Sequence, residues 1–173
     1  AMTSSSSPGI SLKSEGISYI AGSDLPALIV NVQRGGPGLG GIQPSQSDYW
    51  QATKATGHGD FHMLVFAPST VQEMVDLVFD AFDLGDKYRM PAMLFLDGML
   101  GQMMEPVILP DPSSRPVIEK PWAANGHQGK RPHNIINSLY LEPQELERTI
   151  IERFKRYDHI KATEQRAEEY LTD

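Results

Sequence analysis

One arginine stands at the start of a glycine-rich loop, where it could bind an anion. The loop runs from Asn31 to Gly41 (NVQRGGPGLGG), and Arg34 is the only charged residue in it. Glycine lets backbone approach a ligand closely, and a guanidinium offers a planar fork of donors to a carboxylate or a phosphate. The loop is therefore a candidate anion site. The alternative is a surface arginine that pairs with a nearby carboxylate.

The loop directly follows the apolar run from Ala27 to Val32, whose length and boundaries are typical of a buried strand. In an open parallel sheet, ligands bind at the carboxyl ends of the strands, because helices cover both faces. This position raises the case for ligand contact by Arg34 to about equal weight with a structural ion pair, and both alternatives stay open.

The same loop matches the dinucleotide-binding fingerprint through Gly36, Gly38 and Gly41, and Asp60 follows about twenty residues later. A dinucleotide-binding module is therefore an alternative. Against it, the third glycine should open a helix, whereas Pro44 biases the preceding residue away from helical angles.

A histidine between two glycines, His58, precedes the second expected strand and could lie in the same crevice as Arg34; the alternative is a simple turn residue. The other histidines show no metal-ligand spacing, so no metal site is predicted in this chain. These are His62, His127, His133 and His159. No motif for a catalytic nucleophile is present.

The composition excludes several classes of function. The 173 residues suffice for one domain with a core, and no apolar run is long enough to span a membrane. A net charge of -7 argues against a nucleic-acid partner. The absence of cysteine excludes disulfides and cysteine-ligated iron–sulfur clusters in this chain. With no visible signal peptide, we expect a cytoplasmic protein.

Alternating strands and helices predict an α/β fold with a parallel sheet flanked by helices. The expected strands are 27–32, 62–67 and 92–96, and the expected helices are 8–21, 45–55 and one that begins near 71. The serine run before Pro8 is expected to cap the first helix, and Ser69 with Gln72 forms an expected capping box.

Three regions follow from the shifts in composition. Residues 1–105 form the α/β domain, 106–141 an extended linker rich in proline and glycine, and 142–173 a helix that is expected to run to about Leu171. The apolar stripe of this helix would face a partner or join a further domain. Its members are Leu146, Ile150, Phe154 and Tyr157.

Taken together, the motifs of the chain resemble the alpha subunit of the 2-oxoacid:ferredoxin oxidoreductases, most closely the branched-chain (2-oxoisovalerate) type. The resemblance covers essentially the whole chain. The combination of motifs is specific for this family, although no single motif is. It rests on Thr3–Gly9, Glu15–Tyr19, Val32–Pro37, Gln46–Asp48, Gly57–Asp60, Ala67–Ser69, Val71–Met74, Asp97–Met99, Ile136–Tyr140 and Glu169–Leu171.

The resemblance implies part of a pyrimidine-binding domain of thiamine diphosphate enzymes. The cofactor would be shared with a beta subunit that holds the diphosphate and Mg²⁺, while gamma and ferredoxin-like delta subunits complete the complex and iron–sulfur clusters lie outside this chain. The complex would oxidatively decarboxylate a 2-oxoacid with coenzyme A to an acyl-CoA and pass electrons to ferredoxin.

The resemblance also implies roles for particular residues. Arg34 would meet the substrate carboxylate, and the turn formed by Ser7, Pro8 and Gly9 would approach the pyrimidine ring. The glutamate that activates the cofactor in this family has no counterpart here, so no catalytic residue is predicted. We expect a fragment of the alpha subunit that is inactive alone. A truncated, non-catalytic docking piece is the alternative.

Overall fold

The fold is seen in a computed structural model that describes residues 1–54, 57–115, 117–166 and 171–172. The chain divides into two compact units, Ala1–Ser138 and Leu139–Asp173. The first unit contains the sheet and the candidate site. The predicted boundaries after residues 105 and 141 remain predictions.

Four parallel strands form the sheet of the first unit, in the order β1-β2-β4-β3. They are β1 (Met2–Ser5), β2 (Ala27–Gln33), β3 (Leu64–Phe66) and β4 (Pro91–Asp97). The central pair, β2 and β4, is in register from Ala27 opposite Pro91 to Gln33 opposite Asp97. The residues that follow these two strands therefore leave the sheet side by side, at its carboxyl edge.

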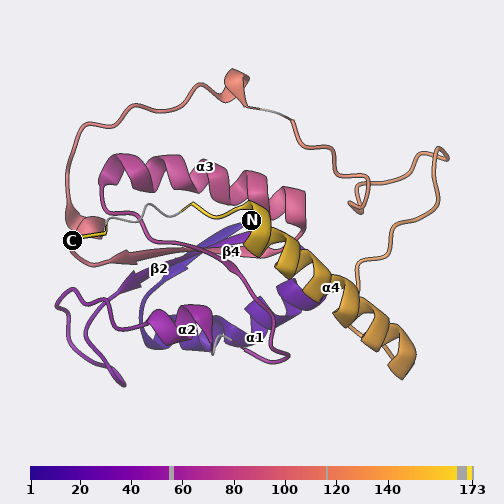
Figure 1. Ribbon diagram of the computed structural model, residues 1–173, viewed down its shortest axis with the longest axis horizontal. Helices are drawn as coiled ribbons and strands as arrows, with labels where there is room; N and C mark the ends of the chain where they lie inside the picture. Colours follow the sequence, from indigo (N-terminus) through magenta and orange to yellow (C-terminus); the bar gives the residue numbers. More distant parts are fainter. Residues whose placement is uncertain (55–56, 116, 167–170, 173) are drawn as a thin grey trace. The chain divides into compact units, whose positions relative to one another are not determined.

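Helices cover both faces of this sheet (Figure 1). Helices α1 (Pro8–Gly22) and α2 (Tyr49–Thr53) lie on one face, and α3 (Val71–Tyr88) lies on the other. A buried cluster joins the first pair of helices to the sheet, with the isoleucine side chains at most 2% exposed. Its members are Ile10, Ile17, Ile29, Ala52 and Met93. The predicted α/β fold with a parallel sheet and flanking helices is confirmed.

The serine run forms part of a strand, which the sequence did not predict. Met2 to Ser5 pair with β2 as the edge strand of the sheet, and the Ser7 side chain makes no capping hydrogen bond to α1. The expected serine cap is therefore wrong. Backbone pairing with a buried neighbouring strand determines the structure here, and the small polar serine side chains do not prevent it.

Three other local expectations need correction. The capping box of α3 is shifted by one residue: Thr70 accepts from the N–H of Glu73, and the Glu73 carboxylate accepts from the N–H of Ser69. Helix α2 begins only at Tyr49, because the preceding residues are bonded to the sheet edge. In the second unit, α4 (Pro143–Thr163) ends well before Leu171. Its end lies close to the point, beyond Ile160, at which the apolar stripe of the sequence fades. Residues 167–170 lie outside the described part.

The linker after β4 is attached along α3, as Figure 1 shows. Gln72 exchanges two hydrogen bonds with the backbone of Ile108. Arg115 pairs with Asp80 at 3.0 Å and Asp83 at 2.6 Å. Only short 3-10 turns interrupt the first part of this segment, at Leu100–Gln102 (η1) and Pro112–Ser114 (η2). Among the described residues, no helix is apolar enough over its length to cross a membrane.

Candidate functional site

The residues of the candidate site lie where three neighbouring strands end. Ser6 and Ser7 follow β1, Arg34 follows β2, and Gly98 follows β4. Since the strands are parallel and adjacent, these residues share the carboxyl edge of the sheet. The parallel topology places Arg34 at this edge, where the sequence predicted it. Its contact with a ligand stays a prediction.

The glycine loop folds back on itself instead of opening a helix. The Gly35 N–H donates to Gln43 O at 3.0 Å, and the Gly41 N–H donates to Gly35 O at 2.8 Å. Gly40 has φ +64°, and a Cβ there would lie 1.8 Å from Gly35 O. The glycines thus serve a tight return of the chain. The loop lacks the strand–turn–helix geometry that the dinucleotide alternative requires.

The Arg34 guanidinium is held by its own loop. Its Nη2 donates to the carbonyl of Leu39 at 3.1 Å, and its Nε is buried without a hydrogen-bond partner. No carboxylate in the described parts of the chain forms an ion pair with it, so the simple ion-pair alternative is not observed. Because Nη2 already donates to Leu39 and Nε is enclosed, an anion has the remaining Nη hydrogens of the guanidinium to bind.

The segment after the loop is tied to two adjacent strand ends. The Gln46 side-chain amide donates to Asp97 Oδ2 at 2.9 Å, and the Asp48 N–H donates to Gln33 Oε1 at 3.0 Å. Gln33 is 2% exposed, so its amide is held in the interior. Both ends of the Arg34 loop are therefore fixed to the sheet edge.

Asp97 also anchors the turn that follows β4. Its Oδ1 accepts from the N–H groups of Leu100 and Met99, each at 2.9 Å. The Leu100 N–H, then the Gln46 amide and the Met99 N–H lower the pKa of Asp97 below its ordinary value, while burial opposes the shift. The ionised carboxylate is thus the form that this arrangement requires.

The turn of Ser7, Pro8 and Gly9 leads directly from the edge strand into α1. Ser7 has φ 53° and ψ -125°, a backbone conformation that costs a non-glycine residue about 1–3 kcal/mol. The Ser7 and Ser6 hydroxyls lie 3.1 Å apart, and either can donate. One hydroxyl hydrogen is therefore available for a ligand. The strained backbone of Ser7 and the available hydroxyl hydrogen are features that a ligand-binding turn has.

A chain of polar side chains runs from the buried Asn31 of β2 out to the surface and joins both helices of one face, and the sequence did not reveal it. Asn31 is completely buried, and its amide donates to Gln51 Oε1 at 3.4 Å. The Gln51 amide donates in turn to Ser11 Oγ at 3.0 Å. A polar residue inside the apolar run Ala27–Val32 was the available signal. This chain connects α2 to the first turn of α1.

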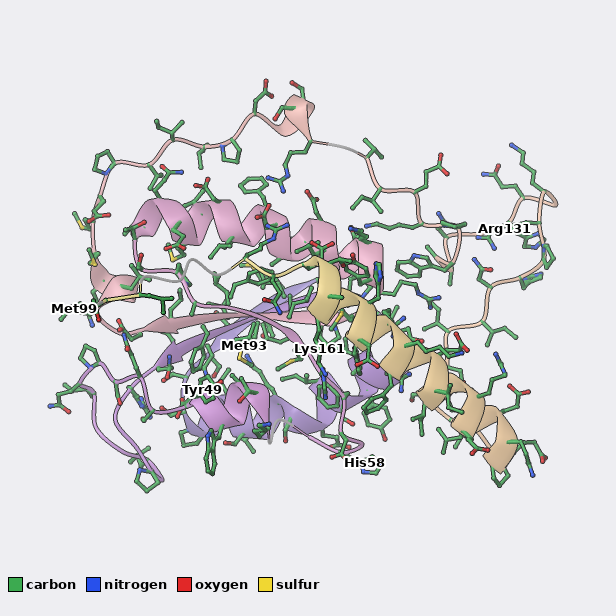
Figure 2. All side chains as sticks on the ribbon, viewed as in Figure 1. Tyr49, His58, Met93, Met99, Arg131 and Lys161 are labelled. Atoms are coloured by element: carbon green, nitrogen blue, oxygen red, sulfur yellow. The ribbon has the colours of Figure 1, made fainter. Side chains whose placement is uncertain are left out.

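His58 does not lie in the Arg34 crevice. Its carbonyl accepts from the Ser18 hydroxyl, in the second half of α1. Figure 2 shows His58 far from Met99, which marks the carboxyl end of β4. His58 lies in a turn, so the turn alternative is confirmed. A residue that precedes a parallel strand lies at the amino edge of the sheet, whereas a residue that follows one lies at the carboxyl edge. Within the described ranges, no group of three metal-ligating side chains occurs.

Nearly the whole chain matches a known protein family. The sequence pattern of the family described as pyruvate flavodoxin/ferredoxin oxidoreductase, thiamine diphosphate-binding, matches residues 1–171. The chain belongs to this family. The chain is 48% identical to ketoisovalerate oxidoreductase subunit VorB of Methanothermobacter thermautotrophicus over 172 residues. These residues make up 99% of the chain and 49% of VorB. The predicted membership in the 2-oxoacid:ferredoxin oxidoreductases is confirmed.

Two further relatives are named for another 2-oxoacid, 2-oxoglutarate. The 2-oxoglutarate synthase subunit KorA of the same organism is 44% identical over 113 residues, or 64% of the chain and 29% of that protein. A 2-oxoglutarate:ferredoxin oxidoreductase of Magnetococcus marinus, solved with 2-oxoglutarate, coenzyme A and succinyl-CoA, superimposes with TM-score 0.80 at 26% identity. The superposition covers 99% of the present chain and 35% of the Magnetococcus marinus chain. The chain spans about half the length of the ketoisovalerate relatives.

Proposed function

We propose that the chain forms part of a ketoisovalerate-type 2-oxoacid:ferredoxin oxidoreductase, which converts a branched-chain 2-oxoacid and coenzyme A to an acyl-CoA and reduces ferredoxin. The observation that carries this proposal is the 48% identity to VorB over nearly the whole chain. The shorter and weaker match to KorA makes 2-oxoglutarate the second candidate substrate.

Arg34 is the residue that we assign to the substrate carboxylate. Its guanidinium stands at the carboxyl edge of β2, is oriented by the Leu39 carbonyl and has donors left over. A carboxylate accepts two parallel hydrogen bonds from such a fork, which fixes the direction of the oxoacid as well as its position. The protein thereby orients the carboxylate that leaves as carbon dioxide.

The apolar side chains of the same loop favour a branched-chain substrate. Leu39 and Ile42 are 80% and 85% exposed, and between Arg34 and Pro44 the loop carries no second cation. A second cation is the strongest partner for the distal carboxylate of 2-oxoglutarate, and this loop does not supply one. An aliphatic group needs only apolar contact.

For the cofactor, we assign the turn of Ser7, Pro8 and Gly9 to the pyrimidine ring. The free hydroxyl hydrogen of the Ser6–Ser7 pair and the position of the turn beside Arg34's strand fit a flat, polar ring. Thiamine diphosphate supplies, when bound, the carbon nucleophile that decarboxylation of a 2-oxoacid needs. The diphosphate and Mg²⁺ are assigned to the beta subunit, and the iron–sulfur clusters to other subunits.

The test is reconstitution of the complex from an alpha subunit in which this chain is joined to the segments that its ketoisovalerate relatives have beyond it, together with the beta, gamma and delta subunits. We expect coenzyme A-dependent reduction of ferredoxin with 2-oxoisovalerate, at a kcat/KM well above that for 2-oxoglutarate. A preference for 2-oxoglutarate would overturn the substrate assignment. A complex that assembles and binds thiamine diphosphate but turns over no 2-oxoacid would favour the non-catalytic docking role.

A further inference from the structure

We propose that Gln46 and Asp97 act together as positioning residues that hold the Arg34 loop in its binding geometry. The proposal rests on the proposed function for its kinetic consequences, because Arg34 is the assigned carboxylate-binding residue. Its structural part, that this side-chain pair keeps the loop closed, stands independently.

Asp97 is a fixed point on the sheet. It is the last residue of β4, in register with Gln33, and its Oδ1 is committed to the Met99 and Leu100 N–H groups. The neighbouring Gly98 N–H donates to Gln33 O at 3.0 Å, so the ends of β2 and β4 are joined directly. The second carboxylate oxygen, Oδ2, is left to accept from Gln46.

Gln46 transmits this fixed position to the loop. It lies two residues beyond Pro44, which bridges to Arg34, and three beyond Gln43, whose carbonyl accepts from Gly35. The loop otherwise consists largely of glycine and has few side chains that could hold it. Without the Gln46 bond, one of the two side-chain hydrogen bonds that tie the segment after the loop to the sheet edge is lost. The bond between Asp48 and Gln33 alone remains.

A reciprocal exchange of the two groups tests the pair. Gln46→Glu places two carboxylates in contact and breaks the bond by repulsion. Adding Asp97→Asn restores it, because the asparagine amide donates to the new carboxylate while its oxygen still accepts from Met99 and Leu100. Gln102→Glu, at an exposed glutamine in η1, is the matched control for the added charge.

The first measurement is hydrogen exchange of the Gly35 and Gly41 amides in the purified chain, which needs no activity. We expect exchange to be about tenfold faster in Gln46→Glu, restored in the double variant and unchanged in Gln102→Glu. Unchanged exchange in Gln46→Glu, or failure of the double variant to restore it, would overturn the proposal.

The second measurement separates positioning of Arg34 from a purely structural role. In the reconstituted complex, Gln46→Glu should raise KM for the 2-oxoacid about tenfold with little change in kcat, and the double variant should recover. Faster exchange with unchanged KM would overturn the positioning role alone. If Arg34→Lys also leaves KM unchanged, the assignment of Arg34 fails, while the exchange result still decides whether the pair holds the loop.

Discussion

The buried side chain of Gln33 accepts a hydrogen bond from the backbone N–H of Asp48 at 3.0 Å, although fifteen residues separate the two in sequence. Between them lies the whole Arg34 loop. The bond brings the chain back to the strand that it left, so the loop projects from one place on the sheet edge. A guanidinium on a loop anchored at both ends loses less conformational entropy when it binds a carboxylate.

Gly40 should be required for this loop geometry. In Gly40→Ala, a Cβ 1.8 Å from Gly35 O and the positive φ both oppose the observed turn. We expect KM for the 2-oxoacid to rise roughly tenfold or more, while the Tm of the chain changes little. Gly36→Ala is the control, since a Cβ there meets nothing within 4 Å and φ is not positive. Equal effects of the two variants would contradict this account.

Asp97 should contribute stability that depends on pH. In the folded chain the pKa of Asp97 lies below its ordinary value of 3.8. The contribution of Asp97 to the free energy of unfolding is therefore complete above pH 3.8, and it is lost as the pH falls through the lower pKa of the folded state. We expect the Tm difference between the wild-type chain and Asp97→Asn to be constant from pH 5 to 8 and to shrink near pH 3. Chemical denaturation across this range provides a second measurement. A difference that grows in acid would contradict the assignment.

Arg115 should hold the linker against α3. Its guanidinium pairs with Asp83 and Asp80, and the Asp83 bond is the main cause of the raised pKa of Arg115. In Arg115→Ala, limited proteolysis within residues 106–120 should become several-fold faster, whereas Tm falls by only about 2–4 °C. Arg148→Ala in α4, which removes an exposed pair with Glu145, is the control and should leave this cleavage unchanged.

The edge strand β1 should drive self-association of the isolated chain. Since Ala1 O accepts from the Leu28 N–H, the backbone groups of Met2 and Ser4 point away from β2. Among these outward groups, only Ser4 O has a partner in the described structure, the Lys13 ammonium. Beside this edge lies an apolar groove of about 330 Å³, which Leu12, Ile17 and Ile20 help to line.

Sedimentation should show concentration-dependent oligomers of the isolated chain. In Ser4→Pro, proline removes an N–H that points outward, so association should weaken without a loss of Tm. Thr3→Pro is the contrast, because it removes a donor to β2 and should lower Tm. A chain that remains monomeric at high concentration would contradict this prediction.

The sequence predicted the elements whose pattern is local. Apolar runs identified β2 and β4, and the helical repeat of apolar residues identified α3. It missed β1, because a run of serines has no apolar pattern of its own and becomes a strand only by pairing with its neighbour β2. It also missed the ties of Gln33, Gln46 and Asp97, since each joins residues that are distant in the chain. Of the two alternatives for His58, the structure shows the turn, because a residue that precedes a parallel strand lies at the amino edge of the sheet, away from Arg34.

If Arg34 binds the substrate carboxylate, its replacement by lysine must weaken substrate binding, and steady-state kinetics of Arg34→Lys in the reconstituted complex measures this loss. Lysine keeps the charge and cannot reproduce the two-pronged contact. We expect KM for 2-oxoisovalerate to rise roughly 10- to 100-fold, with thiamine diphosphate affinity unchanged. Unchanged KM, or a loss of cofactor affinity of the same size, would contradict the claim.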